Sequence, residues 1–399
     1  MTKKRIIIII ISIILIILIV IGYHYYRILT AKILVKTKPV RNIEVFDEVH
    51  ISDMLISING KLINDDLIDT SKVGKQDIEF SYINDDNIKV SFTFDVTIED
   101  NTEPLIGGSN NITVGVGTKE NIVDKFFCGD NYDDEPNCFI EGDYDLTTTG
   151  TYDLIFKAID SSKNEESLNF KLNVIEPKEN KTYNDPNKEI ETTDYNEIVK
   201  NYKNKDNKIG IDVSRWQGKI DFKKVKASNV EFAMIRVGSE DKDGNLFVDP
   251  KFEEYIKGFN EVKIPVGVYY YSYADSVEDA KKEAKFVLKQ IKKYDIDLPV
   301  VFDWENWSNY REYNLSFHSL TNVAEAFLST IEKEGYKGML YSSKYYLENI
   351  WFKTDYDVWL AHYTKQTNYE GKYVMWQLCS NGKVDGINDN MVDIDILYK

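Results

Sequence analysis

The chain has 399 residues, and 66 acidic against 49 basic side chains give it a formal net charge of −17 at pH 7. This length exceeds what one hydrophobic core usually supports, so we expect several domains. The acidic balance argues against a nucleic-acid partner, which would need clustered Lys and Arg, and an apolar content of 43% argues against wholesale disorder.

The N-terminus combines positive charge with a long apolar run. The basic sequence MTKKR precedes Ile6–Ile21, which is interrupted only by Ser12. Extended to Tyr23, the run is long enough to span a bilayer core of about 30 Å. Basic residues tend to stay in the cytoplasm, which places the rest of the chain outside. We predict a single-pass anchor over residues 1–25 of a cell-membrane protein. A cleaved signal peptide is the alternative, but no small-residue cleavage site follows Gly22.

After the anchor, to residue 176, the pattern is of short strands and turns, and it contains an internal repeat. Asp69–Asp85 aligns without a gap on Asp145–Ser161, so that Gly74 falls on Gly150 and Phe80 on Phe156. Segments such as IEFSYI and SFTFDVTI alternate between apolar and polar residues, as half-buried strands do. We predict two small β-sandwich modules over residues 35–99 and 100–176.

The second module carries a G-x-Y…A-x-D-x-x-x-N pattern, seen in YDLTTTGTYDLIFKAIDSSKN. In this it resembles bacterial immunoglobulin-like cell-surface repeats. We interpret the modules as spacers, with sugar or protein binding as the alternative.

The cysteines and histidines bear on compartment and on metal binding. Cys128 and Cys138 flank GDNYDDEPN and are candidates for a disulfide in an oxidising space. Cys379 stands alone in an apolar strand pattern, which predicts a buried thiol. The four His residues are scattered, without zinc spacing or HExxH, so we expect neither a metal nor another cofactor.

Residues 177–207 are charged and almost without apolar periodicity, which predicts a linker with one short helix at DYNEIVKNYK. From residue 208 to 399, strands alternate with amphipathic helices. Five strand–helix units and three closing strands give eight strands, the number of a closed α/β barrel. The predicted fold class is therefore α/β, with a modified TIM-type barrel after the helix and the two β-modules.

Acidic residues stand where the predicted barrel strands end, at the face where such barrels carry their function. They are Asp212 after the first strand, Asp303 and Glu305 at the fourth, and Asp393 on the eighth. Residues i and i+2 of a strand face the same way, so Asp303 and Glu305 point into one cavity. Two such carboxyl groups cannot both ionise cheaply, and a glycosidase needs one protonated and one ionised.

Aromatic residues near the same strand ends suit a sugar cleft, because sugar rings stack on aromatic planes. Filling of the barrel interior is the alternative for each of them. The candidate substrate-binding residues are Tyr269, Tyr271, Tyr341, Trp359, Tyr363 and Trp376.

Five segments of the C-terminal domain resemble one known enzyme family. They are GIDVSRWQGKIDF, FDWE, VWLAHY, MWQ and a closing V-D-x-D. Over residues 208–399 they resemble the family 25 glycoside hydrolases, which are muramidases with a D-x-E active site. Two positions depart from the family pattern: IRVGSEDKDGN replaces a Lys-x-Ser/Thr-Glu-Gly-like segment, and Tyr270 replaces a common His. Arg236 keeps a charge in the first of these segments, whereas Glu240 is displaced from the pattern, so we assign Glu240 no role.

The resemblance implies a lysozyme that hydrolyses the β-1,4 bond between N-acetylmuramic acid and N-acetylglucosamine, with peptidoglycan as its partner. It implies that Glu305 is the general acid and Asp303 its charge-stabilising neighbour, and that Asp212 and Asp393 complete the pocket. The alternative is a non-catalytic wall-binding surface protein built on the same barrel, although such a protein is expected to have lost at least one carboxylate. Another glycosidase acting on chitin-like polymers also stays open.

Overall fold

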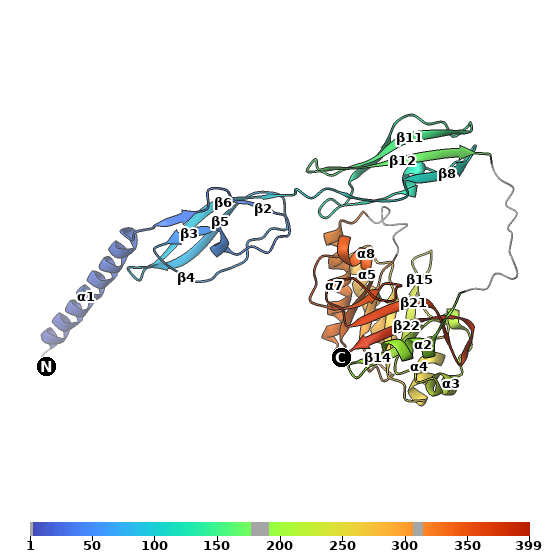
Figure 1. The fold of residues 1–399 in the computed structure, drawn as a ribbon. Helices are drawn as coiled ribbons and strands as arrows, with labels where there is room; N and C mark the ends of the chain where they lie inside the picture. Colours follow the sequence, from blue (N-terminus) through green and yellow to red (C-terminus); the bar gives the residue numbers. More distant parts are fainter. Residues whose placement is uncertain (1–2, 177–190, 306–313) are drawn as a thin grey trace. The chain divides into compact units, whose positions relative to one another are not determined.

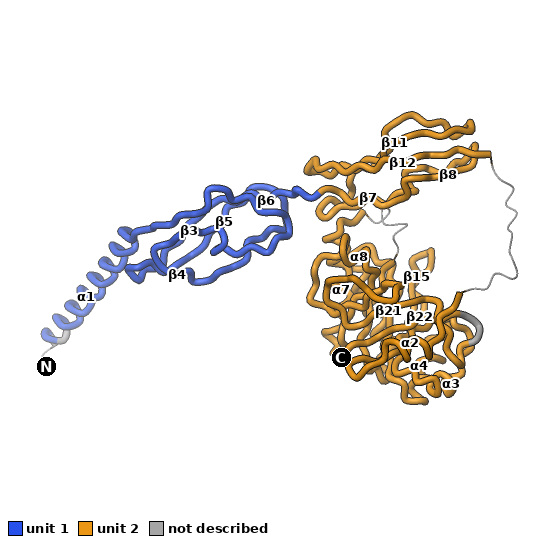
Figure 2. Tube along the Cα trace, in the orientation of Figure 1, with its two compact units in different colours: residues 1–102 blue, residues 103–399 orange. Residues whose placement is uncertain are grey.

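The computed structural model describes residues 3–176, 191–305 and 314–399. Figure 1 shows the helices and strands of the chain. The chain divides into two compact units, residues 1–102 and residues 103–399 (Figure 2). The first holds the N-terminal helix and the first β-module. The second holds the second β-module and the barrel.

Helix α1 (Lys3–Leu29) forms the start of the first unit. Its Ile7–Leu29 segment has a mean hydropathy of 3.1 and is long and apolar enough to cross a membrane. None of that segment is buried against the rest of the chain. A signal sequence near the N-terminus has the same properties, so membrane anchoring stays a prediction.

The first β-module contains a four-stranded sheet in the order β2-β6-β5-β4 and a separate pair, β1 and β3. Buried side chains alternate with more exposed ones on parts of the long strands, as at Phe80, Tyr82, Phe94 and Val96, because one face of the sheet covers the core. The strands are β1 (Val35–Thr37), β2 (Asn42–Glu44), β3 (Leu55–Ile58), β4 (Gly60–Leu62), β5 (Gly74–Asn84) and β6 (Lys89–Glu99).

The second β-module has the same plan, with a four-stranded sheet in the order β10-β11-β12-β8 and a pair formed by β7 and β9. Cys128 on β9 and Cys138 on β10, the predicted pair, form a disulfide that joins the two sheets. The strands are β7 (Leu105–Gly107), β8 (Asn111–Gly115), β9 (Phe127–Gly129), β10 (Asn137–Glu141), β11 (Gly150–Ile159) and β12 (Glu165–Ile175).

The internal repeat is visible in the strand pairing. Gly74 pairs with Ile98 in the β5–β6 hairpin, and Gly150 pairs with Val174 in the β11–β12 hairpin. A parallel strand flanks each hairpin on the same side, β2 beside β6 and β8 beside β12. The repeat therefore encodes one structural unit used twice.

The barrel is closed by its last strand. The strand order is β21-β20-β19-β18-β17-β15-β14-β22, and β22 also pairs with β21, antiparallel to both of its neighbours. These eight strands of the described residues confirm the predicted barrel. They are β14 (Asn207–Val213), β15 (Ala233–Glu240), β17 (Val266–Tyr271), β18 (Val300–Asp303), β19 (Gly338–Ser343), β20 (Asp357–Ala361), β21 (Met375–Val384) and β22 (Ile387–Tyr398), with β16 (Leu246–Val248) paired to β15.

Helices follow the first five barrel strands, as the sequence predicts. They are α3 (Phe222–Ala227), α4 (Phe252–Glu261), α5 (Val277–Ile291), α7 (Phe317–Lys333) and α8 (Lys344–Asn349). One apolar layer lies between the strands and these helices, and a smaller cluster that includes Met234, Met339 and Trp359 fills the barrel interior. The interior is therefore a packed core, and any site must lie at the strand ends.

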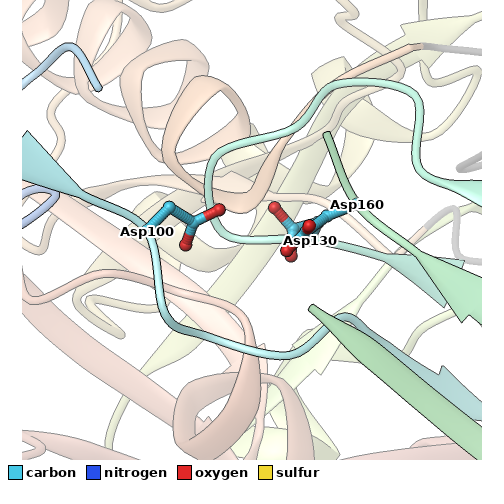
Figure 3. Close-up of side chains that lie close together, drawn as sticks. All are labelled: Asp100, Asp130 and Asp160. Atoms are coloured by element: carbon cyan, nitrogen blue, oxygen red, sulfur yellow. The ribbon is translucent and has the colours of Figure 1, made fainter. Parts of the chain in front are cut away.

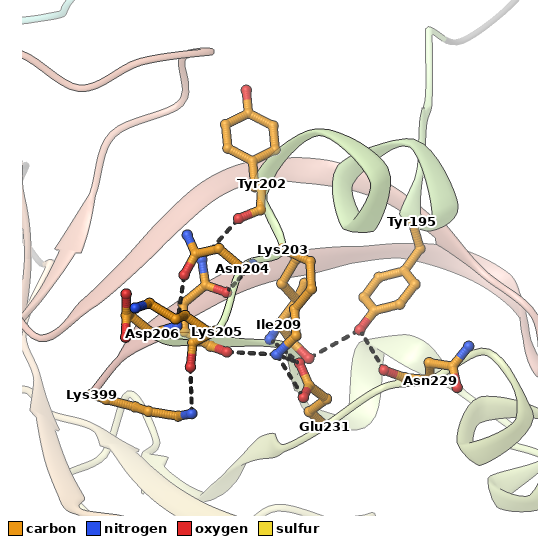
Figure 4. Close-up of polar contacts among 11 residues, drawn as sticks. Tyr195, Tyr202, Lys203, Asn204, Lys205, Asp206, Ile209, Asn229, Glu231 and Lys399 are labelled. Atoms are coloured by element: carbon orange, nitrogen blue, oxygen red, sulfur yellow. Dashed lines mark hydrogen bonds and ion pairs between the residues drawn. The ribbon is translucent and has the colours of Figure 1, made fainter.

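The barrel domain begins earlier than predicted, inside the expected 177–207 linker. Residues 177–190 lie outside the described residues, but β13 (Thr193–Asp194) pairs with β21, and α2 (Tyr195–Tyr202) packs on the barrel. Tyr195 is fully buried, and its hydroxyl donates to the carbonyl of Ile209 at 3.0 Å (Figure 4). The sparse apolar residues of this segment concealed its contribution to the core.

Candidate active site

The four predicted carboxyl groups line one pocket of about 190 Å³ at the mouth of the barrel. Asp212 stands near the end of β14 and Asp303 at the end of β18, while Asp393 lies on β22. Glu305 follows β18 by two residues and is exposed to solvent. The parallel strands bring their carboxyl ends to the same rim, so residues far apart in the chain converge there.

Alternation along the β18 segment separates the two acids from the residue between them. Asp303 and Glu305 both line the pocket. Trp304 is fully buried and packs against Trp351, with 6.2 Å between ring centroids. The expectation that residues i and i+2 share one cavity is met here.

Asp303 and Glu305 form a coupled acid pair. Burial raises the pKa of Asp303 well above its usual range, and the charge of Glu305 and a hydrogen bond shared with it raise that pKa further. Loss of hydration also raises the pKa of Glu305, while the hydrogen bond with Asp303 lowers it. The pair therefore retains a proton where isolated carboxylic acids would be ionised.

Asp212 and Asp393 are register partners across the antiparallel β14–β22 pair. Burial raises the pKa of Asp212 well above its usual range, and the negative charges of Asp393 and Asp395 add to the effect. Burial, followed by the charge of Glu305, raises the pKa of Asp393 to about 7. The pocket thus holds a second group of carboxyls, and their raised pKa values favour the protonated, uncharged forms.

Gln377 on β21 organises the pocket. Its amide nitrogen donates to Asp212 Oδ2 at 2.7 Å. Its carbonyl oxygen accepts from the hydroxyls of Tyr341 and Tyr363, each at 2.9 Å. One buried amide therefore fixes a carboxyl group and two aromatic side chains together.

Arg236 on β15 supplies positive charge to the pocket. Its guanidinium donates to Asp249 Oδ2 through Nε at 2.8 Å and Nη2 at 2.6 Å, and Asp249 is buried. The charge of Arg236 acts to lower the pKa of Asp303. Strand alternation in AMIRVG places Arg236 on the inward face and could have indicated that it lines the pocket.

Asp395 was missed by the sequence analysis. It lies two residues beyond Asp393 on β22, is fully buried, and accepts a hydrogen bond from Trp359 Nε1 at 2.9 Å. Strand alternation in the closing V-D-x-D places both acids on the interior face, which could have indicated it.

Five of the six predicted aromatic residues line the pocket: Tyr269, Tyr271, Tyr341, Trp359 and Tyr363. The sixth, Trp376, does not. Its ring packs on Tyr202 of α2, with 6.1 Å between centroids, and its Nε1 donates to the carbonyl of His362 at 2.9 Å. Gln377 faces inward, so its neighbour on the strand must face outward. Tyr270, the departure from the family pattern, likewise packs outward between strands and helices.

A second cavity, of about 480 Å³, adjoins the first and shares three lining residues with it, Glu305, Tyr341 and Tyr363. Its other lining residues include Lys344, Tyr345 and His362. Glu305 therefore lies where the two cavities meet, whereas Asp303 lines only the smaller one.

The family model described as glycosyl hydrolases family 25 matches residues 211–387. The uncharacterized protein YegX of Escherichia coli O157:H7 is 30% identical over 197 residues, which are 47% of this chain and 68% of YegX. The chain belongs to glycosyl hydrolase family 25. The family match includes Asp212, Asp303 and Glu305 and ends before Asp393.

Other relatives match a similar share of this family 25 chain. YegX of E. coli K12 is 31% identical over 189 residues, and the match covers 45% of this chain and 65% of that protein's length. The autolytic lysozyme of Clostridium acetobutylicum is 25% identical over 189 residues, covering 47% of this chain and 54% of the lysozyme.

Among solved structures, a family 25 glycosyl hydrolase from Bacillus anthracis has 24% identity and a TM-score of 0.43, covering 50% of this chain and 92% of its own. The autolysin LytC of Streptococcus pneumoniae, in complex with a synthetic peptidoglycan ligand, has 25% identity and a TM-score of 0.44. It covers 61% of this chain and 56% of its own.

Proposed function

We propose that the chain is a lysozyme that hydrolyses the β-1,4 bond between N-acetylmuramic acid and N-acetylglucosamine in peptidoglycan. The observation that carries this proposal is the convergence of four carboxyl groups on one pocket, where burial raises the pKa values of the neighbouring acids Asp303 and Glu305. Membership of family 25 supports glycosidase chemistry, and a relative named as an autolytic lysozyme supports the substrate.

In the proposed mechanism Glu305 donates a proton to the glycosidic oxygen as the bond to the anomeric carbon breaks. It is the exposed member of the acid pair and therefore the one that a polymer reaches. Asp303, buried beside it, stabilises the positive charge that develops on the sugar ring until the oxygen of a water molecule bonds to the anomeric carbon. The charge of Arg236 acts to lower the pKa of Asp303 and so favours the ionised form that this role requires. The proton that the water molecule loses restores the acid pair.

The remaining pocket residues hold the sugar and the acids in place. Gln377 orients Asp212, and it also fixes Tyr341 and Tyr363, whose rings offer apolar surfaces to a sugar ring. The adjoining cavity accommodates the rings on one side of the bond that is cut.

We propose the following layout for the whole chain: an anchor at residues 1–25, β-modules at 35–99 and 100–176, a linker from 177 and then the barrel. The helix would keep the enzyme at the outer face of the cell membrane. The closest competing function is a wall-binding surface protein without activity, and retention of all four carboxyls argues against it.

The test uses full-length protein in detergent and purified Gram-positive cell walls. The proposal predicts loss of turbidity and release of reducing ends by the wild type, and neither by Glu305→Gln. Wild-type protein that binds walls but releases no reducing ends would favour the non-catalytic alternative. An active Glu305→Gln variant would remove Glu305 from the mechanism.

A further inference from the structure

The second β-module contacts the barrel within the same compact unit, residues 103–399. The contact joins the loop between Cys128 and Cys138 to the first turn of α7. The backbone amide of Phe317 donates to the carbonyl of Asp130 at 2.8 Å, and the amide of His318 donates to the carbonyl of Asn131 at 3.2 Å. Two amides that lack partners within the helix therefore find them in the module.

Asp134, in the same loop, completes the cap. Its Oδ1 accepts from the backbone amide of Ser316 at 2.7 Å and from the hydroxyl of Ser319 at 3.0 Å. Ser316 is the helix's own N-cap, and its hydroxyl accepts from the amide of Ser319 at 3.1 Å. A carboxylate at this end of a helix is also favoured by the helix dipole.

An apolar contact accompanies the polar ones. The rings of Phe127 and Phe317 stack with 6.2 Å between centroids and 15° between planes. Both side chains are buried, and Phe127 belongs to the apolar cluster of the barrel although it stands on β9 of the module. The module thus contributes a side chain to the barrel's core.

The loop that makes these contacts is held in shape from inside the module. The disulfide closes it at both ends. Asp130 Oδ1 accepts from the amides of Tyr132 and Asp133, and Asp133 Oδ2 accepts from the amide of Ser161. Figure 3 shows Asp130 and Asp160 lying close together where β9 and β11 end. Reduction of the disulfide would remove the covalent link between the two ends of this loop and leave only its hydrogen bonds.

Helix α7 links the contact to the acid pair. It packs along β18, with Phe327 5.2 Å from Phe302 between ring centroids, and β18 ends at Asp303. The start of α7 is therefore connected through the helix to the strand that ends at Asp303.

We infer that the second β-module is a positioning part of the catalytic unit and not a spacer. Its disulfide-closed loop caps α7 and holds that helix against β18. The consequence for activity rests on the proposed muramidase function, whereas the consequence for α7 does not. Because the disulfide needs an oxidising space, the enzyme reaches full activity only after export.

The first test compares Asp134→Ala with Asp145→Ala in the full-length protein. Asp145 is a matched control, because it also accepts from a backbone amide and from hydroxyls, but only within the module, at Thr147 and Thr148. Asp134→Ala should raise amide hydrogen exchange in the first turn of α7 by about tenfold. It should also lower kcat with little change in KM. Asp134→Asn, which keeps an acceptor oxygen, should restore most of both.

The second test removes the disulfide with Cys128→Ser/Cys138→Ser and uses Cys379→Ser as the control. Cys379 is a half-buried free thiol on β21. The double variant should reproduce the faster exchange at α7 and the lower kcat. Unchanged exchange at α7 in both Asp134→Ala and the double variant would overturn the inference, as would faster exchange with a wild-type kcat. Inactive wild-type protein would instead refute the muramidase proposal and leave the exchange result valid.

Discussion

Buried acids line the pocket of the barrel, and another buried acid lies on α5, beside Ser272 at the end of β17. Comparing the two places shows that burial of an acid does not by itself make it catalytic. Glu283 on α5 is 1% exposed, accepts a hydrogen bond from the hydroxyl of Ser272 at 2.5 Å, and has a pKa raised by burial to about 8. The pocket acids have raised pKa values for the same first cause. Glu283, however, does not line the pocket. A perturbed carboxyl indicates a catalytic site only where substrate can reach it.

The largest expected effect is the difference in kcat between a variant of the pocket acid Glu305 and a variant of the buried acid Glu283 on α5. Glu305→Gln should lower kcat by a factor of about 10³, because loss of a general acid typically costs 10²–10⁴. Glu283→Gln should leave kcat within about threefold, because a neutral amide replaces a carboxyl that carries a proton at neutral pH. Reducing-end release from cell walls measures both. Equal losses in the two variants would erase the distinction.

The next effect concerns the scaffold of the pocket. Gln377→Ala leaves buried Asp212 without its amide donor, so kcat/KM should fall by about tenfold and the free energy of unfolding by about 1–3 kcal/mol. Asn381→Ala on the same strand is the control, since its amide donates to the carbonyl of Glu191 outside the pocket. Steady-state kinetics and urea unfolding are the measurements. Wild-type kinetics in Gln377→Ala would show that the network is dispensable.

A smaller effect appears in stability as a function of pH. The folded-state pKa of Glu283, about 8, exceeds the ordinary glutamate value, so its contribution is present at acid pH and is lost as pH rises through about 8. Between pH 5.5 and 9 the wild type should therefore lose more stability than Glu283→Gln, by an amount on the order of 1–3 kcal/mol. Urea unfolding at the two pH values measures the difference. Parallel losses in the two proteins would show that Glu283 is not buried as described.

The smallest effect is expected at the outward-facing aromatic residue. Trp376→Phe should leave KM within about twofold, because the ring packs on Tyr202 and not in the pocket. Tyr363→Ala, at a residue that is 58% exposed in the pocket, should raise KM by about fivefold. Michaelis kinetics on soluble glycan fragments compare them. A higher KM for Trp376→Phe than for Tyr363→Ala would reverse the assignment of faces.

Much of the fold and the site could be predicted because local patterns determine them. Strand alternation predicted the hairpins of both modules and the shared direction of Asp303 and Glu305. Alternating strands and helices predicted the barrel, and the position of acids at strand ends predicted four carboxyls of its pocket.

What could not be predicted depends on contacts between distant segments. Tyr195 lies in a charged, Asn-rich stretch, and its burial depends on barrel residues that follow it. The cap that the second module places on α7 joins Asp134 to Ser316 and has no local signature. Trp376 is a different case, because its position is encoded locally. Neighbouring residues of a strand face opposite sides, so an inward-facing Gln377 implies an outward-facing Trp376.

The measurement that tests the central claim most directly is the identity of the new reducing-end sugar. Peptidoglycan digested by the full-length protein is reduced with borohydride, hydrolysed, and analysed for the sugar alcohol that marks the cut. A muramidase predicts muramitol, which is absent after digestion with Glu305→Gln. Glucosaminitol instead, or no new sugar alcohol at all, would contradict the assignment of this barrel as a lysozyme.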